Sequence, residues 1–366
     1  MDGLVEEVRE FGVRVRVRSA EIERGRTLPG DVVDGLADIG VFRLAAPRGV
    51  GGLDVGPVSF ARVCEELGYA DGSVGWVAMI AAATSMTLAF LEPEVAHAML
   101  ADRRFMIAGV AAPFGTATPV GGGYRVRGRW PFASGCEHAT WLVGGCRVAG
   151  DRPAVRMMIM PAEALTVHDT WDVSGLRGTG SHDIEAGDVF VAEHHSFSLA
   201  DEPRQESAVS GLPALSILAL GIAAVPLGVA RRAIEEFTSL ARSKRDPVGG
   251  QWLAGKSWVR SAVAEAESLR AAGLAYLLGE VSAAGPRDVT AVARLRLAIA
   301  TAARNATQAV DLMYEAAGGT SVYASSPLQR HFRDVHAAAQ HAMVGPDVRE
   351  TVGAVLLGED VNTARL

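Results

Sequence analysis

The chain has 366 residues, of which 49% are hydrophobic and 21% charged, and its formal net charge is −7. This composition excludes a disordered or collagen-like chain, and the length predicts two or three structural units. The acidic balance argues against nucleic acid or an anionic membrane surface as a partner, because both attract basic faces. Three cysteines without CxxC spacing and an N-terminus without an apolar signal core predict a cytoplasmic protein.

The first hundred residues are predicted to be helical, because they lack the alternation of polar and apolar residues that strands show. Turn-forming sequences such as Leu28-Pro29-Gly30 separate the helices. We therefore expect an N-terminal helical domain over residues 1–104. The predicted helices are 4–23, 30–39, 57–70, 74–90 and 93–102.

Between residues 105 and 204 the sequence changes to short segments rich in Val, Ile, Thr and aromatic residues, several of them separated by glycine. The segment YRVRGRW at 124–130 alternates as a half-buried antiparallel strand does. We expect a middle β-domain over 105–204, folded as a small barrel or sandwich.

Helices return after residue 205 and are longer than before. In 291–317, apolar and small residues recur in steps of three and four, which is typical of a helix packed against another helix. The uncharged stretch 212–230 is long enough to cross a bilayer, but it contains two prolines and lacks an aromatic belt, so we expect a buried helix. A C-terminal four-helix bundle over 205–366 follows, and the fold class is α+β, mostly α. Its predicted helices are 211–242, 252–284, 291–317 and 328–357.

The segment GQWLAGKS at 250–257 satisfies the phosphate-loop pattern GxxxxGK[ST]. That loop needs a preceding buried strand and small residues around the phosphate, whereas a helix end precedes this segment and Trp252 and Leu253 are bulky. We interpret it as a helix start, which can still hold an anion. The chain also lacks HExxH, GxSxG and GxGxxG motifs, which argues against a metal site, a serine hydrolase and a Rossmann dinucleotide site.

Residues 129–141, RWPFASGCEHATW, end a predicted strand in a small hydroxyl residue and a glycine flanked by aromatic residues. Apolar faces with one hydroxyl group suit a flat aromatic ligand with a ring heteroatom, although composition alone favours an ordinary strand end. His341 has a side chain whose ordinary pKa suits proton transfer near neutrality. On composition alone it is an ordinary core or surface histidine.

Five segments together resemble a known family. Over nearly its whole length the chain resembles the acyl-CoA dehydrogenase superfamily, and most closely its flavin-dependent monooxygenases of two-component systems. The resemblance implies an α-domain, a β-domain and a C-terminal four-helix bundle, assembled as a homotetramer. The segments are PRGVGGLDV at 47–55, DGSVGW at 71–76, GGGYRVRGRWPFASGCEHATW at 121–141, WDVSGLRGTGSHD at 171–183 and SPLQRHFRDVHAAAQHAM at 326–343.

The position of the catalytic base separates the branches of this superfamily. Dehydrogenases remove the α-proton of a thioester with a glutamate, which the resemblance places at about Ala342 or about Leu218 in this sequence. Neither side chain can abstract a proton. The resemblance therefore implies an oxygenase that uses O2 and reduced flavin, through a C4a-hydroperoxyflavin, to hydroxylate or N- or S-oxidise a small organic substrate.

The same resemblance implies the cofactor and partners. The cofactor is reduced flavin, FMNH2 or FADH2, which a separate NAD(P)H-dependent flavin reductase supplies, and no metal is expected. Two alternatives stay open: an atypical acyl-CoA dehydrogenase or flavin oxidase with a different base, and a non-catalytic relative. The substrate stays open as well, and an aromatic ring, a sugar amine and a sulfur heterocycle all suit the resemblance.

The resemblance also implies roles for single residues. Ser134 matches the hydroxyl that faces flavin N5, and His341 matches the histidine that handles protons beside the flavin, so these are the expected catalytic residues. Trp76 and His341 would border the substrate, and the segment 112–115 is expected to be a loop against the flavin ring. The expected flavin-binding residues are Ala112, Trp130, Phe132, Ala133, Ser134, Arg245, Gly318, Gly319 and Ser321, the last four partly across a subunit interface.

Overall fold

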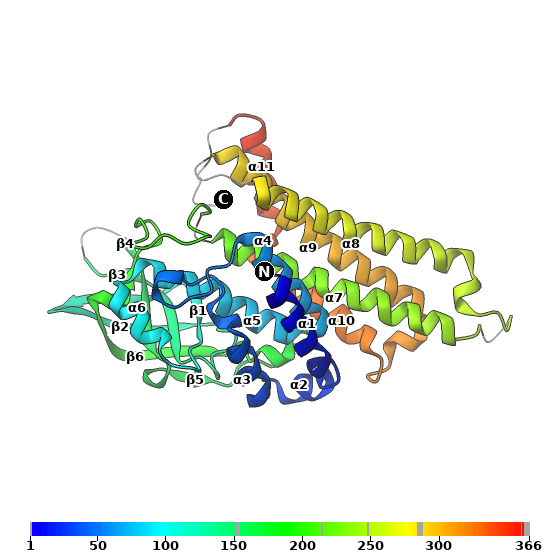
Figure 1. Cartoon of the computed structure of the whole chain (residues 1–366), viewed down its shortest axis with the longest axis horizontal. Helices are drawn as coiled ribbons and strands as arrows, with labels where there is room; N and C mark the ends of the chain where they lie inside the picture. The colour runs from blue at the N-terminus through cyan, green and yellow to red at the C-terminus, as the bar shows by residue number, and fades with distance from the viewer. Residues whose placement is uncertain are drawn as a thin grey trace.

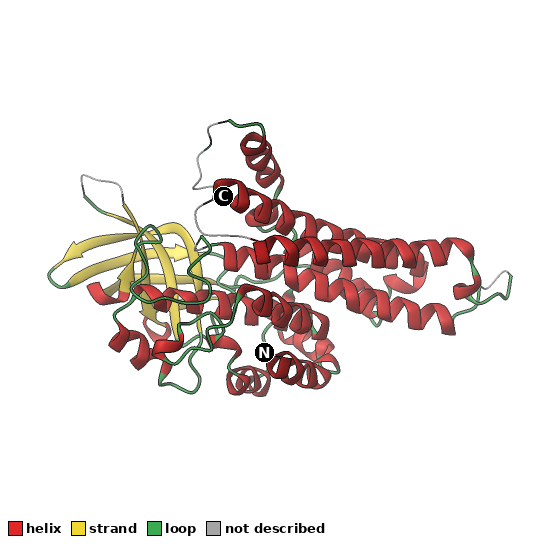
Figure 2. Ribbon diagram, turned by 45° about the horizontal axis from the view of Figure 1, so that its top comes forward, coloured by secondary structure: helices red, strands yellow, loops and turns green. Residues whose placement is uncertain are grey.

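The protein has an N-terminal group of helices, a central sheet and a C-terminal group of longer helices. The computed structural model describes residues 2–150, 154–213, 215–246, 249–283, 288–359 and 361. The sheet lies at one end of the molecule, and the long C-terminal helices extend away from it (Figure 1). Figure 2 shows the N-terminal helices packed between the sheet and the bundle. This order of helices, strands and helices confirms the predicted fold class.

One of the N-terminal helices, α5 (Gly72–Thr84), is buried along nearly its whole length. Helix α5 begins at Asp71, whose carboxylate accepts hydrogen bonds from the backbone N–H groups of Ser73 and Val74, as an N-cap does. It continues as a 3-10 helix, η3 (Ser85–Phe90). The other helices are α1 (Asp2–Arg16), α2 (Ser19–Gly25), α3 (Gly30–Ile39), α4 (Pro57–Ala70) and α6 (Pro93–Leu100).

The strands form one mixed sheet of seven strands, ordered β5-β6-β2-β1-β3-β4-β7, where a barrel or sandwich was predicted. Strand β1 pairs with β3 in parallel and with β2 in antiparallel fashion. The pairing register of β1 shifts between Val110 and Gly115, so the segment 112–115 is an irregular part of a strand and not the predicted loop. The strands are β1 (Ile107–Val120), β2 (Gly123–Trp130), β3 (Trp141–Val148), β4 (Ala154–Pro161), β5 (Thr166–His168), β6 (Asp183–Ala192) and β7 (Ser196–Phe197).

Trp130 fills the centre of this sheet. Its side chain is fully buried, and its indole N–H donates to the carbonyl oxygen of Gly145 at 2.8 Å. The ring lies where glycines leave space, since a Cβ atom on Gly144 or Gly115 would come within 2.7 or 2.3 Å of it. The prediction that Trp130 binds flavin is therefore wrong for its side chain, and only its backbone atoms could contact a ligand.

The C-terminal helices are α7 (Ser216–Ser243), α8 (Ser257–Ala283), α9 (Val289–Ala317), α10 (Pro327–Ala338) and α11 (Pro346–Leu356). The predicted helix 328–357 is two helices: α10 ends at Ala338, and α11 begins only after Gly345, its N-cap, with Pro346 as its first residue. The break contains His341 and a 3-10 turn, η9 (Ala342–Val344). This break takes His341 off the regular helix and places it at a cap position.

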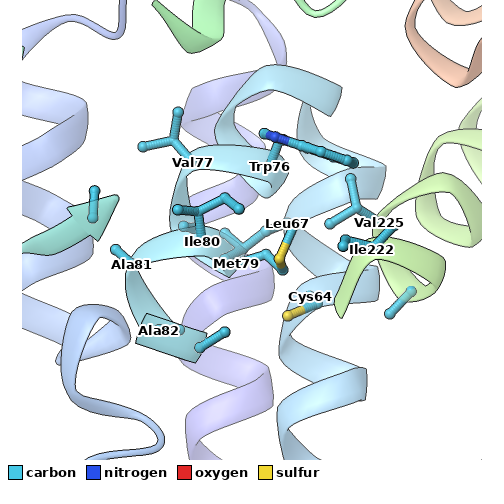
Figure 3. Packing of buried hydrophobic residues seen from close by; sticks show 14 of the residues in the cluster. Cys64, Leu67, Trp76, Val77, Met79, Ile80, Ala81, Ala82, Ile222 and Val225 are labelled. Carbon is cyan, nitrogen blue, oxygen red and sulfur yellow. The ribbon is translucent and has the colours of Figure 1, made fainter. Parts of the chain in front are cut away.

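Two apolar helical stretches, Gly72–Phe90 and Ser216–Ser243, are long enough to cross a bilayer. In this structure 94% and 83% of their most apolar windows are buried inside the protein, so both serve as core helices. Figure 3 shows how they meet: Trp76, Met79 and Ile80 of α5 lie beside Ile222 and Val225 of α7. The predicted buried helix at 212–230 is thus confirmed from Ser216, where α7 begins, to Ala230, and residue 214 lies outside the described residues.

Candidate active site

Ser134 lies in a turn directly after β2 and is 4% exposed. Two backbone hydrogen bonds hold this turn against the segment 179–182: Ala133 N–H donates to the His182 carbonyl and Gly135 N–H to the Thr179 carbonyl. Within the turn, Ser134 N–H donates to the Phe132 carbonyl. Phe132 has a φ angle of +65°, which a non-glycine residue rarely adopts. Such strain concentrates at functional sites.

A chain of hydroxyl groups fixes the direction of the Ser134 proton. Thr179 Oγ1 donates to the carbonyl oxygen of Leu176 at 2.9 Å, and a carbonyl can only accept. The Ser181–Thr179 bond of 2.6 Å therefore uses the Ser181 proton, and the Ser134–Ser181 bond of 2.7 Å uses the Ser134 proton. Ser134 Oγ also accepts from the indole N–H of Trp76 at 3.1 Å. One lone pair on Ser134 Oγ remains, so this hydroxyl presents an acceptor to a ligand.

His341 stands on the other side of Trp76. The two rings lie 6.0 Å apart between centroids, and Trp76 is only 6% exposed. His341 Nδ1 accepts from the backbone N–H of Met343 at 3.2 Å, so the ring proton is on Nε2. Burial, and after it the positive charge of Arg296, lower the pKa of His341 to about 4. The expectation of titration near neutrality is therefore wrong, and His341 is a neutral hydrogen-bond donor at pH 7.

The structure distinguishes His341 from His336, its neighbour in the sequence. His336 lies on α10, where its Nε2 is 2.8 Å from Asp311 Oδ1 and its ring contacts Phe332 at 4.4 Å. It makes a local hydrogen bond on the bundle, whereas His341 adjoins the cluster of Ser134 and Trp76.

A small apolar cavity lies next to this cluster, and we call it the inner cavity. Its volume is about 70 Å³, and its walls come from α5, η3, β1, β3, β4 and α7. Ile80 lies one helical turn after Trp76 on α5, so the cavity continues the Trp76 face of that helix. None of the described residues that line it is acidic. They are Ile80, Ala83, Thr84, Met86, Thr87, Gly109, Val110, Ala111, Val143, Met157, Leu199, Leu215 and Leu218.

A larger, more open cavity, the outer cavity, shares Met86 and Leu199 with the inner one. Its volume is about 410 Å³, and it lies between η3, the segment 199–213 and the first turns of α7 and α9. Leu218, where the dehydrogenase branch would place a glutamate, is among the walls of the inner cavity. The inner cavity is apolar, whereas the walls of the outer one, which is open to solvent, include Asp201 and Glu202.

The surroundings of Ser134 fit a flavin ring. Phe132, two residues before Ser134, has a 69% exposed side chain that contacts Trp171 edge-on at 6.2 Å. Large exposed apolar surfaces commonly mark a site where a ligand or partner binds. An apolar surface beside one unused hydroxyl lone pair suits the flat apolar ring and the N5–H group of a reduced flavin. Ala133 is buried behind this surface, and Ala112 is half-buried on β1.

The remaining predicted flavin residues lie elsewhere in the same chain. Lys244, at the end of α7, donates to the carbonyl oxygen of Ala317 at 3.1 Å, which joins the ends of α7 and α9. Figure 1 shows these ends at the part of the bundle that lies away from the sheet. Arg245 stacks on Trp252 at 3.9 Å, and Ser321 is buried and donates to the Gly318 carbonyl at 2.7 Å. Arg245, Gly318, Gly319 and Ser321 are therefore not brought to Ser134 within one chain.

The phosphate-loop pattern at 250–257 does not form such a loop. A 3-10 turn, η7 (Leu253–Gly255), leads into α8, and the described residues before it form a turn at Gly250. The ammonium group of Lys256 pairs with the carboxylate of Asp246. The segment is the predicted helix start, and its lysine already has a carboxylate partner.

Sequence reasoning missed three residues of this site. Thr179 and Ser181 stand within the quoted GLRGTGS turn, and their hydroxyl side chains in an alternating pattern were the available signal. Arg296 gives no signal in the sequence, because arginine on a long helix is ordinarily solvent-exposed. In the structure, burial and hydrogen bonds identify Thr179 and Ser181, and burial identifies Arg296.

Comparisons with known proteins identify the family of this chain. The family description "Acyl-CoA dehydrogenase, N-terminal domain" matches residues 2–102, and "Acyl-CoA dehydrogenase, C-terminal domain" matches residues 220–346. The chain is 32% identical to an indole-3-acetate monooxygenase of Pseudomonas putida, over 95% of this chain and 92% of the relative. It is 31% identical to the flavin-dependent monooxygenase oxygenase subunit HsaA of Rhodococcus jostii, over 91% and 92% of the two chains.

Solved structures give the same result. The crystal structure of 3-HSA hydroxylase from Rhodococcus sp. RHA1 superposes with a TM-score of 0.91 at 28% identity, covering 99% of this chain and 98% of that one. XiaF from Streptomyces sp., solved in complex with FADH2 and glycerol, superposes with a TM-score of 0.87 at 28% identity, covering 98% of both chains.

Proposed function

This chain belongs to the acyl-CoA dehydrogenase family and is, within it, a flavin-dependent monooxygenase. From this premise we propose that it oxidises a small aromatic substrate at the inner cavity, near Ser134 and His341. The observation that carries the proposal is the unused acceptor lone pair on Ser134 Oγ, whose partner Trp76 lies one helical turn before Ile80 in the wall of the inner cavity. A dehydrogenase would need a carboxylate base there, and none of the described residues of the inner cavity supplies one.

The roles of the residues follow from their hydrogen bonds. When bound, reduced flavin supplies the reaction with O2. Ser134 Oγ would accept the N5 hydrogen, since its own proton points to Ser181. His341 offers the proton on Nε2 as a hydrogen-bond donor to a polar atom of a bound ligand, and does not act as a base at pH 7. The apolar walls exclude water, which otherwise competes for the reacting groups.

The substrate class is supported by the lining of the cavity and by the relatives. Aliphatic and methionine side chains suit an aromatic ring. The curated relatives act on indole-3-acetate in one case and on resorcinol in another, as their names state. The relatives named as oxygenase components support a separate NAD(P)H-dependent flavin reductase as the partner that supplies FMNH2 or FADH2.

We further propose a homotetramer in the cytoplasm. Arg245, Gly318, Gly319 and Ser321 lie at the end of the bundle away from Ser134, so they could contact a flavin only if it is bound to another copy of the chain. The proposal for these four residues therefore depends on assembly.

The test is an anaerobic titration of the protein with FMNH2 and FADH2, followed by mixing with oxygenated buffer. We expect reduced flavin to bind more tightly than oxidised flavin, and the absorbance of oxidised flavin to return after a lag. Reoxidation at the rate of free reduced flavin would contradict the proposal. Tight binding of oxidised FAD that an acyl-thioester bleaches would indicate the dehydrogenase alternative, and no flavin binding would indicate a non-catalytic relative.

A further inference from the structure

Asp334 on α10 is a buried acid, 5% exposed, that the mechanism given above does not use. Its Oδ1 accepts from the backbone N–H of Leu176 at 2.7 Å, although the two residues are 158 positions apart in the sequence. Leu176 has a φ angle of +52°, which a non-glycine residue rarely adopts. Such a conformation persists only where the surrounding contacts hold it, and the bond to Asp334 is one of them.

Helix α10 holds the neighbours of Leu176 as well. The guanidinium group of Arg333 donates to the carbonyl oxygen of Ser174. Gly175 lies so close to α10 that a Cβ atom there would come within 2.0 Å of the Arg333 carbonyl oxygen. Three consecutive residues, 174–176, are thus fixed against α10, and we call them the clamped turn.

The clamped turn ends at the hydroxyl chain of Ser134. The Leu176 carbonyl oxygen accepts from Thr179 Oγ1 at 2.9 Å, and this bond sets the direction of the hydroxyl protons from Thr179 through Ser181 to Ser134. If that carbonyl moves away, the Thr179 proton can turn to Ser181, and the chain can reverse. Ser134 would then direct its own proton at the ligand and lose the acceptor lone pair that the flavin site needs.

We propose that Asp334 is a positioning residue of the flavin site: by holding Leu176 it fixes the hydroxyl chain, so that Ser134 keeps its proton on Ser181 and presents a lone pair to flavin N5. The proposal rests on the proposed function and adds a positioning residue to that site. Asp334 acts on the flavin only through Leu176 and the hydroxyl chain. Because His341 follows the end of α10, this helix and the break after it position both polar groups of the site.

The charges around Asp334 let it respond to pH near neutrality. Burial and then the charge of Asp71, the N-cap of α5, raise the pKa of Asp334 to about 7, whereas the Leu176 N–H and the charges of Arg330 and Arg333 on α10 act against this rise. A hydrogen bond to an ionised carboxylate is stronger than one to the neutral acid. Ionisation of Asp334 should therefore tighten the clamped turn.

The first experiment is a double-mutant cycle on the return of oxidised flavin after the reduced-flavin complex is mixed with O2. Asp334→Ala should speed this return by about two- to fivefold, whereas Asp334→Asn, which keeps an acceptor oxygen, should stay within about twofold of wild type. In the Ser134→Ala background, D334A should have almost no further effect, because the hydroxyl that it positions is absent. The control Glu66→Ala removes another buried carboxylate, whose ion pairs lie on α1 and α7, and should lower stability without changing the flavin rate.

The double-mutant cycle separates positioning from a general loss of stability. Folded D334A with the wild-type flavin rate, independent effects of D334A and S134A in the double variant, or the same acceleration in E66A would overturn the proposal.

The second experiment needs neither flavin nor O2, so its outcome is separate from a failure of the monooxygenase assignment, and it does not require D334A to fold. The protein is labelled with 5-fluorotryptophan, and the Trp76 signal is identified by its loss in Trp76→Phe. Because the Trp76 indole N–H donates to Ser134 Oγ, this signal reports on that hydroxyl. His341, the other ring beside Trp76, has a pKa of about 4 and is neutral throughout the range used.

We expect the fluorine signal of Trp76 in wild type to shift with a midpoint near pH 7 as Asp334 ionises, and D334N to remove this shift. A Trp76 signal that stays constant between about pH 5.5 and 8.5, or a shift that persists in D334N, would overturn the proposal.

Discussion

Replacing Ser134 by alanine tests the centre of the site, because it removes two hydrogen bonds and one free lone pair. The indole N–H of Trp76, 6% exposed, loses its acceptor at 3.1 Å. A buried donor left without a partner costs about 1–3 kcal/mol, so the free energy of unfolding should fall by this amount. Loss of the bond to flavin N5 should cost about 1.4 kcal/mol or more, which corresponds to about tenfold faster return of oxidised flavin after mixing with O2.

Chemical denaturation measures the first effect, and stopped-flow absorbance of the reduced-flavin complex mixed with O2 measures the second. Ser181→Ala is the matched control, because it breaks the same hydroxyl chain but leaves the Ser134 oxygen in place as an acceptor for Trp76 and for the flavin. We expect a smaller change in the flavin rate for S181A than for S134A. If S134A is destabilised but its flavin rate equals that of wild type, Ser134 has only a structural role.

Three other predictions follow from buried groups. At His341, glutamine keeps a hydrogen-bond donor near the position of Nε2, whereas asparagine keeps only the acceptor for the Met343 N–H, so H341Q should retain more turnover than H341N. The pH profile of wild-type turnover should show no inflection from His341 near pH 6.5, because the pKa of His341 is about 4. For Asp334, burial and then the charge of Asp71 raise the pKa of the carboxyl group to about 7, so the folded protein binds this proton more tightly than the unfolded chain. The stability that this proton contributes is fully present below about pH 4 and is lost as the pH rises toward 7, by up to about 1.4 kcal/mol per pH unit. Asp334→Asn should flatten this dependence of the unfolding free energy on pH, as measured by denaturation curves. For the sheet, Gly144→Ala brings a Cβ within 2.7 Å of the Trp130 ring and should cost about 1–3 kcal/mol in thermal denaturation, whereas Gly187→Ala, with nothing within 4 Å, should cost far less.

Much of the fold could be predicted from periodicity and resemblance, because long helices and alternating strands repeat their pattern over many residues. The break at His341 could not, since the run Ala337-Ala338-Ala339 favours a continuous helix, and only Gly345 and Pro346 show that it ends. The break matters for function, because at this position His341 caps the 3-10 turn, and its Nδ1 accepts from Met343 N–H, which fixes the ring proton on Nε2.

The site was predicted in part. Ser134, Trp76 and His341 are brought together as the resemblance implies. Trp130 was misjudged because the burial of its ring depends on the pairing of β2 with its neighbours and on Gly115 and Gly144 of β1 and β3, which alternation within β2 does not show. Arg296 could not be identified, since its burial is set by the packing of α9 and not by its neighbours in the sequence.

The most direct test of the account is a crystal structure of the protein with reduced flavin bound, grown without O2. We expect flavin N5 within hydrogen-bonding distance of Ser134 Oγ and the flavin ring against Phe132. We also expect His341 near the flavin face that is turned toward the inner cavity. A flavin bound elsewhere, or one whose N5 is held by a different residue, would contradict the central claim.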